Sequence, residues 1–344
     1  MSFLERFVPI LIFLLSITVL SEIATVAEVF DRLAQKLTKM ARGSLLGLYL
    51  IVTVTASLIT IFLGLDTTAV LFTPVVIALA NRIGAKAFPF AMATLLLSNT
   101  ASLLLPVSNL TNLLAQTKLK VNTHLYVGHV FLSAIVAIIL SIVLLLLRFR
   151  TSIQGQYQFT PLEPVEDKPL LYIVSVACTL FIAMVLLNLS PVISSVLAAS
   201  ISAVSLHVRR KGFLTWNIIP WRLLLFTSAL FAAISFVNKL GLAKILTRVT
   251  SSHWEILLSS TLLANLFNNL PTYLAFESLQ KTTDLYYVLI GTNFGSIIFP
   301  WGSLATLLWA QRCRASGVEI SWSKVVSFSA LCAAVIVPVS ALFL

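Results

Sequence analysis

Two segments of the chain, residues 98–114 and 292–308, interrupt long apolar runs with the same polar residues at the same spacing. They align without a gap at an offset of 194 residues, and 6 of 17 positions are identical. The identical positions include Asn99 with Asn293, Ser102 with Ser296, and Pro106 with Pro300. Proline removes a backbone donor, so such a segment breaks a membrane helix. A matched pair of broken helices in two halves indicates a secondary transporter and marks its binding site.

The apolar runs around these segments place the chain in a membrane. Its 344 residues are 59% hydrophobic and 10% charged, whereas roughly a quarter of a soluble domain is charged. Runs of about 20 apolar residues recur from residue 7 to residue 344, the length that spans a bilayer. We expect an all-α, polytopic protein of the cell membrane, built from two inverted repeats, each with a re-entrant hairpin and a broken helix.

The net charge of +11 fits cytoplasmic loops rich in Lys and Arg better than nucleic-acid binding. If the first hairpin opens to the cytoplasm, 16 of the 23 Lys and Arg residues lie inside. This bias supports that orientation, in which the two hairpins enter from opposite faces. The sequence has no Walker-type phosphate loop and no Rossmann glycine motif, so an ion gradient or another subunit must supply the energy.

The hydropathy pattern divides the chain into a first repeat (1–148), a cytoplasmic linker (149–169) and a second repeat (170–344). The elements expected in the first repeat are a span at 7–27, an amphipathic surface helix at 28–40, a hairpin at 44–81 with its tip at 66–68, a broken helix at 88–118 and a span at 124–147. The second repeat is expected to hold spans at 170–189, 191–207 and 223–237, a surface helix at 239–249, hairpin arms at 256–267 and 272–279 around a tip at 268–271, a broken helix at 286–311 and a last span at 325–344. The first repeat lacks counterparts of 170–189 and 191–207, so either the scaffold is reduced or the true start lies upstream.

Five segments carry a resemblance to a known family: 66–74, 99–103, 107–110, 268–272 and 300–309. With the hydropathy layout around them, the chain resembles the arsenical pump membrane protein (ArsB) family. That family lies in an ion transporter superfamily that includes Na⁺/dicarboxylate symporters and NhaD-type Na⁺/H⁺ antiporters. The resemblance implies a scaffold region, a moving transport region and a mid-membrane site made of the hairpin tips 66–68 and 268–269 and the helix breaks 106–112 and 300–306. Ser98-Asn99-Thr100 also spells a signature of dicarboxylate carriers, but it precedes the break rather than forming a tip, so we interpret that match as accidental.

Asp66 is the only acidic residue at the tip of either predicted hairpin. An ionised carboxylate at the bilayer centre costs about 2.5–3.5 kcal/mol on insertion scales. We therefore assign Asp66 to proton coupling. The alternative is that Asp66 caps the return arm, and the two roles are compatible. The full set of expected substrate-binding residues is Asp66, Thr67, Thr68, Asn99, Ser108, Asn109, Asn112, Asn268, Asn269, Asn293, Gly302, Ser303 and Thr306.

These amides and hydroxyls supply both donors and acceptors, as a neutral trihydroxy solute such as arsenous acid needs. We expect export of arsenite or antimonite in exchange for protons, or else a Na⁺/H⁺ antiporter or a carrier of small anions such as dicarboxylates. An intramembrane enzyme or a channel is disfavoured, because the spans show no catalytic constellation and the paired breaks suit a gated carrier. No cofactor and no metal site are expected, since the four histidines form no cluster. The sequence leaves open whether the chain forms a homodimer and whether an ATPase subunit joins it.

Overall fold

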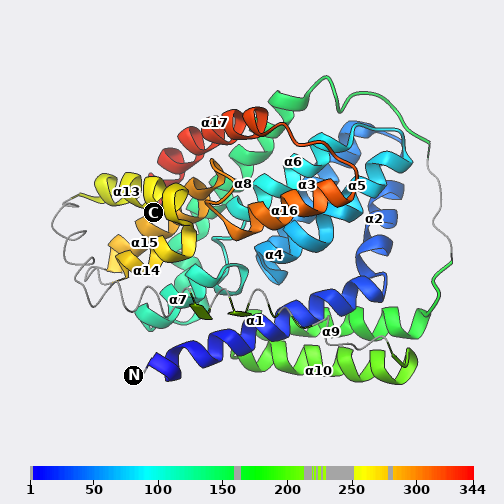
Figure 1. Ribbon diagram of the computed structural model, residues 1–344, viewed down its shortest axis with the longest axis horizontal. Coiled ribbons are helices and arrows are strands. Elements are labelled where there is room, and N and C mark those ends of the chain that lie inside the picture. Colours follow the sequence, from blue (N-terminus) through cyan, green and yellow to red (C-terminus); the bar gives the residue numbers. More distant parts are fainter. Residues whose placement is uncertain are drawn as a thin grey trace.

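The computed structural model describes residues 3–158, 164–212, 252–277 and 282–344, with a few isolated positions between 219 and 229 (Figure 1). Apart from those isolated positions, the expected span 223–237 lies outside the described residues, as do the expected surface helix 239–249 and residues 278–279 of the second hairpin. Among the described helices, those long and apolar enough to cross a membrane are α3 (Leu45–Leu63), α8 (Thr123–Phe149), α9 (Lys168–Leu186), α10 (Pro191–Arg209) and α17 (Trp322–Ala341). The prediction of an all-α, polytopic membrane protein is confirmed.

The first span and the helix after it meet at a sharp corner. α1 (Phe3–Val26) and α2 (Val29–Met40) are bent by 61° at a short break, and the pair counts as a sixth span if taken as one. Glu28, at the corner, has a left-handed backbone (φ 59°). α2 is amphipathic and buries Phe30, Ala34 and Leu37. The helix expected at 28–40 is confirmed.

Three helices form a group on one side of the molecule. α1 packs mainly against α10, which also packs against α9, and the three lie side by side at the bottom of Figure 1. The segment expected as the linker contacts the connection between α2 and α3. There the Tyr157 hydroxyl donates to the Thr38 carbonyl of α2 at 2.6 Å. The boundaries of the repeats and the linker stay predictions.

Both broken helices are present, and their ends repeat at the offset found in the sequence. The halves of the first are α6 (Ala87–Thr100) and α7 (Leu110–Leu119), and those of the second are α15 (Thr282–Phe294) and α16 (Leu304–Ala315). The first halves end at 100 and 294 and the second halves begin at 110 and 304, each pair 194 residues apart. The inverted orientation of the two repeats stays a prediction.

The breaks lie earlier than expected, at 101–109 and 295–303 rather than at 106–112 and 300–306. The reason is the direction of the helical ladder. Pro106 and Pro300 cannot donate to the carbonyls four residues before them, so the helix is lost on the N-terminal side of each proline. Asn109 and Ser303 both have extended backbones and are the N-cap residues of α7 and α16. Asn112 and Thr306 therefore lie in the first turns of these helices.

Each hairpin turns at a single residue. α3 ends before Gly64, and the return arm is helical from Leu65 to Arg82 through α4 (Leu65–Thr67), a π-helix (Thr68–Phe72) and α5 (Thr73–Arg82). In the second hairpin, Asn268 separates α13 (His253–Phe267) from α14 (Asn269–Phe276). The expected tip at 66–68 is therefore wrong, because the turn needs the backbone freedom of Gly64. The capping role considered for Asp66 is also wrong, since Gly64 takes the N-cap position and Asp66 lies in the first turn.

The two turn residues share one unusual conformation, with φ 94° and ψ 160° at Gly64 and φ 85° and ψ 153° at Asn268. This region is nearly restricted to glycine, and a side chain there costs on the order of 1–3 kcal/mol. We expect Gly64→Ala to lower the free energy of unfolding by about that amount, measured by thermal unfolding in detergent. Asn268→Gly is the matched control and is expected to be close to neutral, because relief of strain offsets its lost hydrogen bonds. If Gly64→Ala were as stable as the wild type, this account of the turn would be contradicted.

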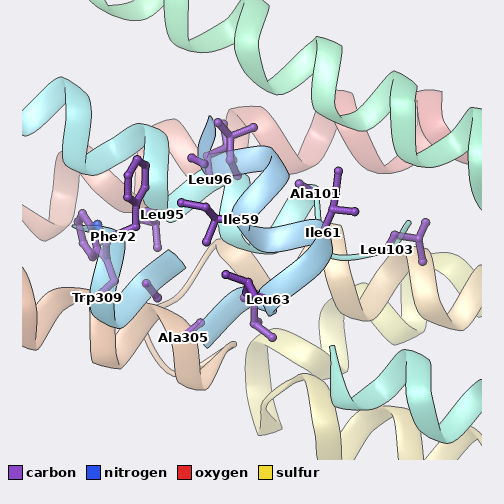
Figure 2. Packing of buried hydrophobic residues seen from close by; sticks show 14 of the residues in the cluster. Ile59, Ile61, Leu63, Phe72, Leu95, Leu96, Ala101, Leu103, Ala305 and Trp309 are labelled. Carbon is purple, nitrogen blue, oxygen red and sulfur yellow. The ribbon is translucent and has the colours of Figure 1, made fainter. Parts of the chain in front are cut away.

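The two halves share one apolar core, shown in Figure 2. Ile59 and Phe72 of the first hairpin and Leu95 of α6 are fully or nearly fully buried there, together with Trp309 of α16. The Trp309 indole Nε1 donates to the Ala91 carbonyl of α6 at 2.7 Å. The second broken helix is thereby anchored in the first half of the chain, and the breaks of both halves are held next to each other.

Candidate functional site

A pocket of about 80 Å³ lies where α1 faces the two hairpin turns and the two helix breaks. A water needs about 10–15 Å³ of such space, so the pocket has room for roughly five to eight waters or for one small solute. It is lined by Phe13, Leu14, Ile17, Thr18, Leu63, Gly64, Leu65, Asp66, Thr67, Val107, Ser108, Asn109, Leu110, Asn268, Asn269, Leu270, Ser303, Leu304 and Ala305. Among these described lining residues, Asp66 is the one ionisable side chain, and none is Lys, Arg or His.

Four helical segments begin at the wall of this pocket. Their first residues are Leu65, Leu110, Asn269 and Leu304, and each follows a turn or break described above. The start of a helix carries a partial positive charge and unsatisfied N–H groups. Their convergence favours a solute with oxygen atoms at the centre of the pocket, and discontinuous helices of this kind form the sites of secondary transporters.

The hairpin turns are fastened to the helix breaks by short hydrogen bonds. The Ser108 hydroxyl donates to the Ile61 carbonyl at 2.5 Å. In the second half, the Asn269 amide N–H donates to the Gly302 carbonyl at 2.8 Å, and Asn268 Nδ2 donates to the Trp301 carbonyl at 2.9 Å. A Cβ at Gly302 would lie 2.3 Å from the Ser296 carbonyl oxygen, so only glycine fits this turn. Hairpin and break therefore form one rigid wall in each half.

Asp66 lies in the first turn of its helix, half-buried at the pocket wall. Within the described ranges its carboxylate has no hydrogen bond or ion pair to another residue. Its neighbour Thr67 exchanges a hydrogen bond with Ser21 of α1 at 3.0 Å between the two hydroxyl oxygens. Thr68 instead pairs with Thr60 of α3 at 2.7 Å and does not line the pocket. The first hairpin thus presents a carboxylate to the pocket and a hydroxyl to α1.

Behind the pocket, Asn293 of α15 binds three side chains of the first half. Its Oδ1 accepts from the Ser102 hydroxyl and from Asn109 Nδ2, both at 2.7 Å. Its Nδ2 donates to Asn112 Oδ1 at 3.0 Å and to the Leu289 carbonyl at 2.8 Å. Every hydrogen-bonding position of this carboxamide is filled. We call Asn293, Ser102, Asn109 and Asn112 the closed node, because Asn293 joins the two halves with all four positions of its carboxamide filled.

Seven of the expected site residues line the pocket: Asp66, Thr67, Ser108, Asn109, Asn268, Asn269 and Ser303. Six others, namely Thr68, Asn99, Asn112, Asn293, Gly302 and Thr306, do not. The sequence analysis missed Thr18 and Ser21 of α1, Ser102 of the closed node, and Asn265, whose Oδ1 accepts from the Phe299 N–H at 3.1 Å. A signal existed for Ser102, which is identical between the repeats, and for Asn265, an amide inside an apolar arm.

Comparison with known proteins gives consistent relatives. The family profile described as citrate transporter matches residues 5–288. An arsenical pump membrane protein of Escherichia coli is 30% identical over 313 residues, covering 82% of this chain and 72% of that protein. A putative arsenical pump membrane protein of Bacillus subtilis is 23% identical over 367 residues, covering 91% and 81%. A 46 kDa membrane protein of Mycobacterium leprae is 23% identical over 345 residues, covering 91% and 80%.

Proposed function

Since the chain belongs to the family of arsenical pump membrane proteins, we propose that this membrane transporter exports arsenite or antimonite in exchange for protons. The observation that carries the proposal is the pocket itself. It places hydroxyls, amides, helix starts and one carboxylate around a space the size of a small inorganic solute. Arsenous acid offers three O–H donors and three oxygen acceptors, which such a wall can bind without a charged partner.

Asp66 is the residue we assign to the proton. It is the one ionisable group among the described residues that line the pocket, so a proton and the solute would bind in one place. A carboxylate at the wall of such a pocket can take up and release a proton as its access to water changes. Binding and release of a proton at Asp66 as the pocket changes sides would couple the two fluxes.

The movement we propose carries the hairpins and broken helices past α1. α1 belongs to the group with α9 and α10, and it contributes an apolar wall of Phe13, Leu14 and Ile17 to the pocket. Apolar side chains make no directional bonds that would hold a moving partner in one register. The hydrogen bond between Ser21 and Thr67 is a polar contact that would have to break in this movement.

The assay is uptake into everted membrane vesicles that carry the protein, energised by a pH gradient and offered arsenite, Na⁺ or succinate in parallel. We expect arsenite to accumulate in a manner that collapses with a protonophore. Vesicles without the protein are the control. Uptake of succinate or Na⁺ with no arsenite uptake would overturn the proposal.

A second candidate is a carrier of small carboxylates or other anions. The match to the citrate transporter family favours it, and helix starts attract anions. The lack of Lys, Arg and His among the described lining residues speaks against a multivalent anion, and the carboxylate of Asp66 would repel one. The succinate arm of the vesicle assay decides between the two.

A further inference from the structure

The closed node around Asn293 has a counterpart around Asn99, because the two asparagines are 194 residues apart in the aligned repeats. Both side chains begin in the same way. Asn293 Nδ2 donates to the Leu289 carbonyl at 2.8 Å, and Asn99 Nδ2 donates to the Leu95 carbonyl at 3.1 Å, four residues back in each case. The surroundings of the two oxygens then differ.

At the offset of 194, Asn109 and Asn112 correspond to Ser303 and Thr306. The helices correspond too, since α7 packs against α15 and α16 packs against α6. Serine and threonine reach less far than asparagine, so they do not close the hydrogen bonds that their counterparts make. Among the described residues, Asn99 Oδ1, Ser303 Oγ and Thr306 Oγ1 have no hydrogen-bond partner, although these three residues are 0–1% exposed. We call these three residues the open node.

Two further features distinguish the break beside the open node from the first break. In the first half, Asn112 Nδ2 donates to the Ser102 carbonyl at 2.6 Å. In an unbroken helix the N–H of residue 106 would bind this carbonyl, but Pro106 has no N–H. In the second half, Pro300 likewise has no N–H to donate to the Ser296 carbonyl, and Thr306 carries a hydroxyl where Asn112 carries an amide. Ser303 also makes no side-chain cap for α16, whereas Asn109 Oδ1 caps α7 by accepting from the Thr111 N–H at 3.2 Å.

Buried polar atoms in folded proteins nearly always have a hydrogen-bond partner. The three atoms of the open node are exceptions, and their counterparts in the closed node are all bonded, so the difference needs an explanation. Ser303 lines the pocket, which connects the open node to the space that the solute would occupy. An amide oxygen and two hydroxyls carry no charge and can all accept from O–H groups. Because Asn99 Oδ1 can only accept, this chemistry fits a neutral solute with several hydroxyls better than a fully deprotonated oxyanion.

We propose that Asn99 Oδ1, Ser303 Oγ and Thr306 Oγ1 form an inner subsite that binds the hydroxyl groups of a neutral polyhydroxy solute such as arsenous acid. The proposal rests on the transport function proposed above and names the atoms that would select the solute. The closed node holds the two halves together. The open node occupies the counterpart positions with shorter side chains, so its polar atoms are available to bind the solute.

The test compares arsenite binding by purified wild-type protein and Thr306→Val, followed through the rise in melting temperature with arsenite concentration. Valine keeps the shape and removes the unpaired hydroxyl, so the stability without arsenite is expected to stay equal or rise. The dissociation constant for arsenite is expected to increase by about three- to tenfold, the worth of one hydrogen bond. Ser133→Ala, which removes another buried unpaired hydroxyl away from the pocket, is the control with unchanged affinity.

A second variant reverses the asymmetry. Ser303→Asn/Thr306→Asn copies the closed node into the second half and is expected to raise the melting temperature and to abolish the shift produced by arsenite. Wild-type arsenite affinity in Thr306→Val, in a protein that binds arsenite, would overturn the subsite and leave the transport function standing. Stabilisation of the wild type by Na⁺ in place of K⁺, lost in Thr306→Val, would also overturn it by showing a cation site. A wild type that does not respond to arsenite would instead refute the proposed function.

Discussion

Asp66→Asn is expected to fold and to bind arsenite while losing the uptake of arsenite that a pH gradient drives into everted vesicles. Asparagine keeps the size and the hydrogen-bonding atoms of the side chain but cannot take up and release a proton. Within the described part of the chain no other ionisable group lines the pocket, so none can replace it there. Folding is checked by the melting temperature, binding by its response to arsenite, and coupling by the initial rate of uptake.

Asp31→Asn is the matched control for this variant. Asp31 lies in the first turn of α2 and does not line the pocket, so its uptake rate is expected to equal that of the wild type. Undiminished uptake by Asp66→Asn under a pH gradient would refute the coupling role of Asp66. Loss of both uptake and arsenite binding would instead assign Asp66 to solute binding rather than to coupling.

Asn293→Leu is expected to lower the free energy of unfolding by about 2–4 kcal/mol, the largest loss of stability among these variants. The substitution keeps the approximate volume and removes the Asn293 partner of the Ser102 hydroxyl, the Asn109 amide and the Asn112 carbonyl oxygen. The Ser102 hydroxyl keeps its bond to the Asn99 carbonyl, whereas the buried Asn109 Nδ2 loses its bond to Asn293 with no replacement. The three bonds lost with Asn293 cross between the halves of the chain. The measurement is thermal or denaturant unfolding in detergent.

Asn99→Leu, at the counterpart position, is the control. Asn99 donates to the Leu95 carbonyl and to the Ser98 hydroxyl within its own helix, and its side-chain oxygen has no partner in the described part of the chain. We expect it to lose less than half as much stability as Asn293→Leu. Equal losses would contradict the distinction between the closed and open nodes.

The sequence was sufficient to predict both broken helices, because each proline there stands among polar residues that recur at the same spacing in the other half. Proline alone is not enough, since α17 continues through Pro338. The prediction placed the breaks too late at 106–112 and 300–306, since a polar residue such as Asn112 can sit inside the new helix as easily as in the break. It also gave the first hairpin a polar tip at Asp66, whereas the turn requires the backbone of Gly64. Polarity marks the region of a break, and only backbone conformation fixes the residue.

The candidate site divides in a similar way. Hairpin and break residues with polar side chains could be expected in one place because the repeat pairs them. The contribution of α1 to the pocket could not be predicted, since Phe13, Leu14 and Ile17 resemble the apolar residues of any other membrane span. The difference between Asn99 and Asn293 was equally hidden, because identical residues acquire different roles from the lengths of the side chains that face them.

Locating the bound solute tests the central claim, that the pocket between α1 and the two halves is the transport site. The measurement is the anomalous scattering of antimony in crystals grown with antimonite, using a chain in which Cys178, Cys313 and Cys332 are replaced by alanine so that no thiol competes for the metalloid. We predict a single strong peak within the pocket, close to Asn109 and Ser303. A peak elsewhere in a protein that still transports antimonite would contradict the account.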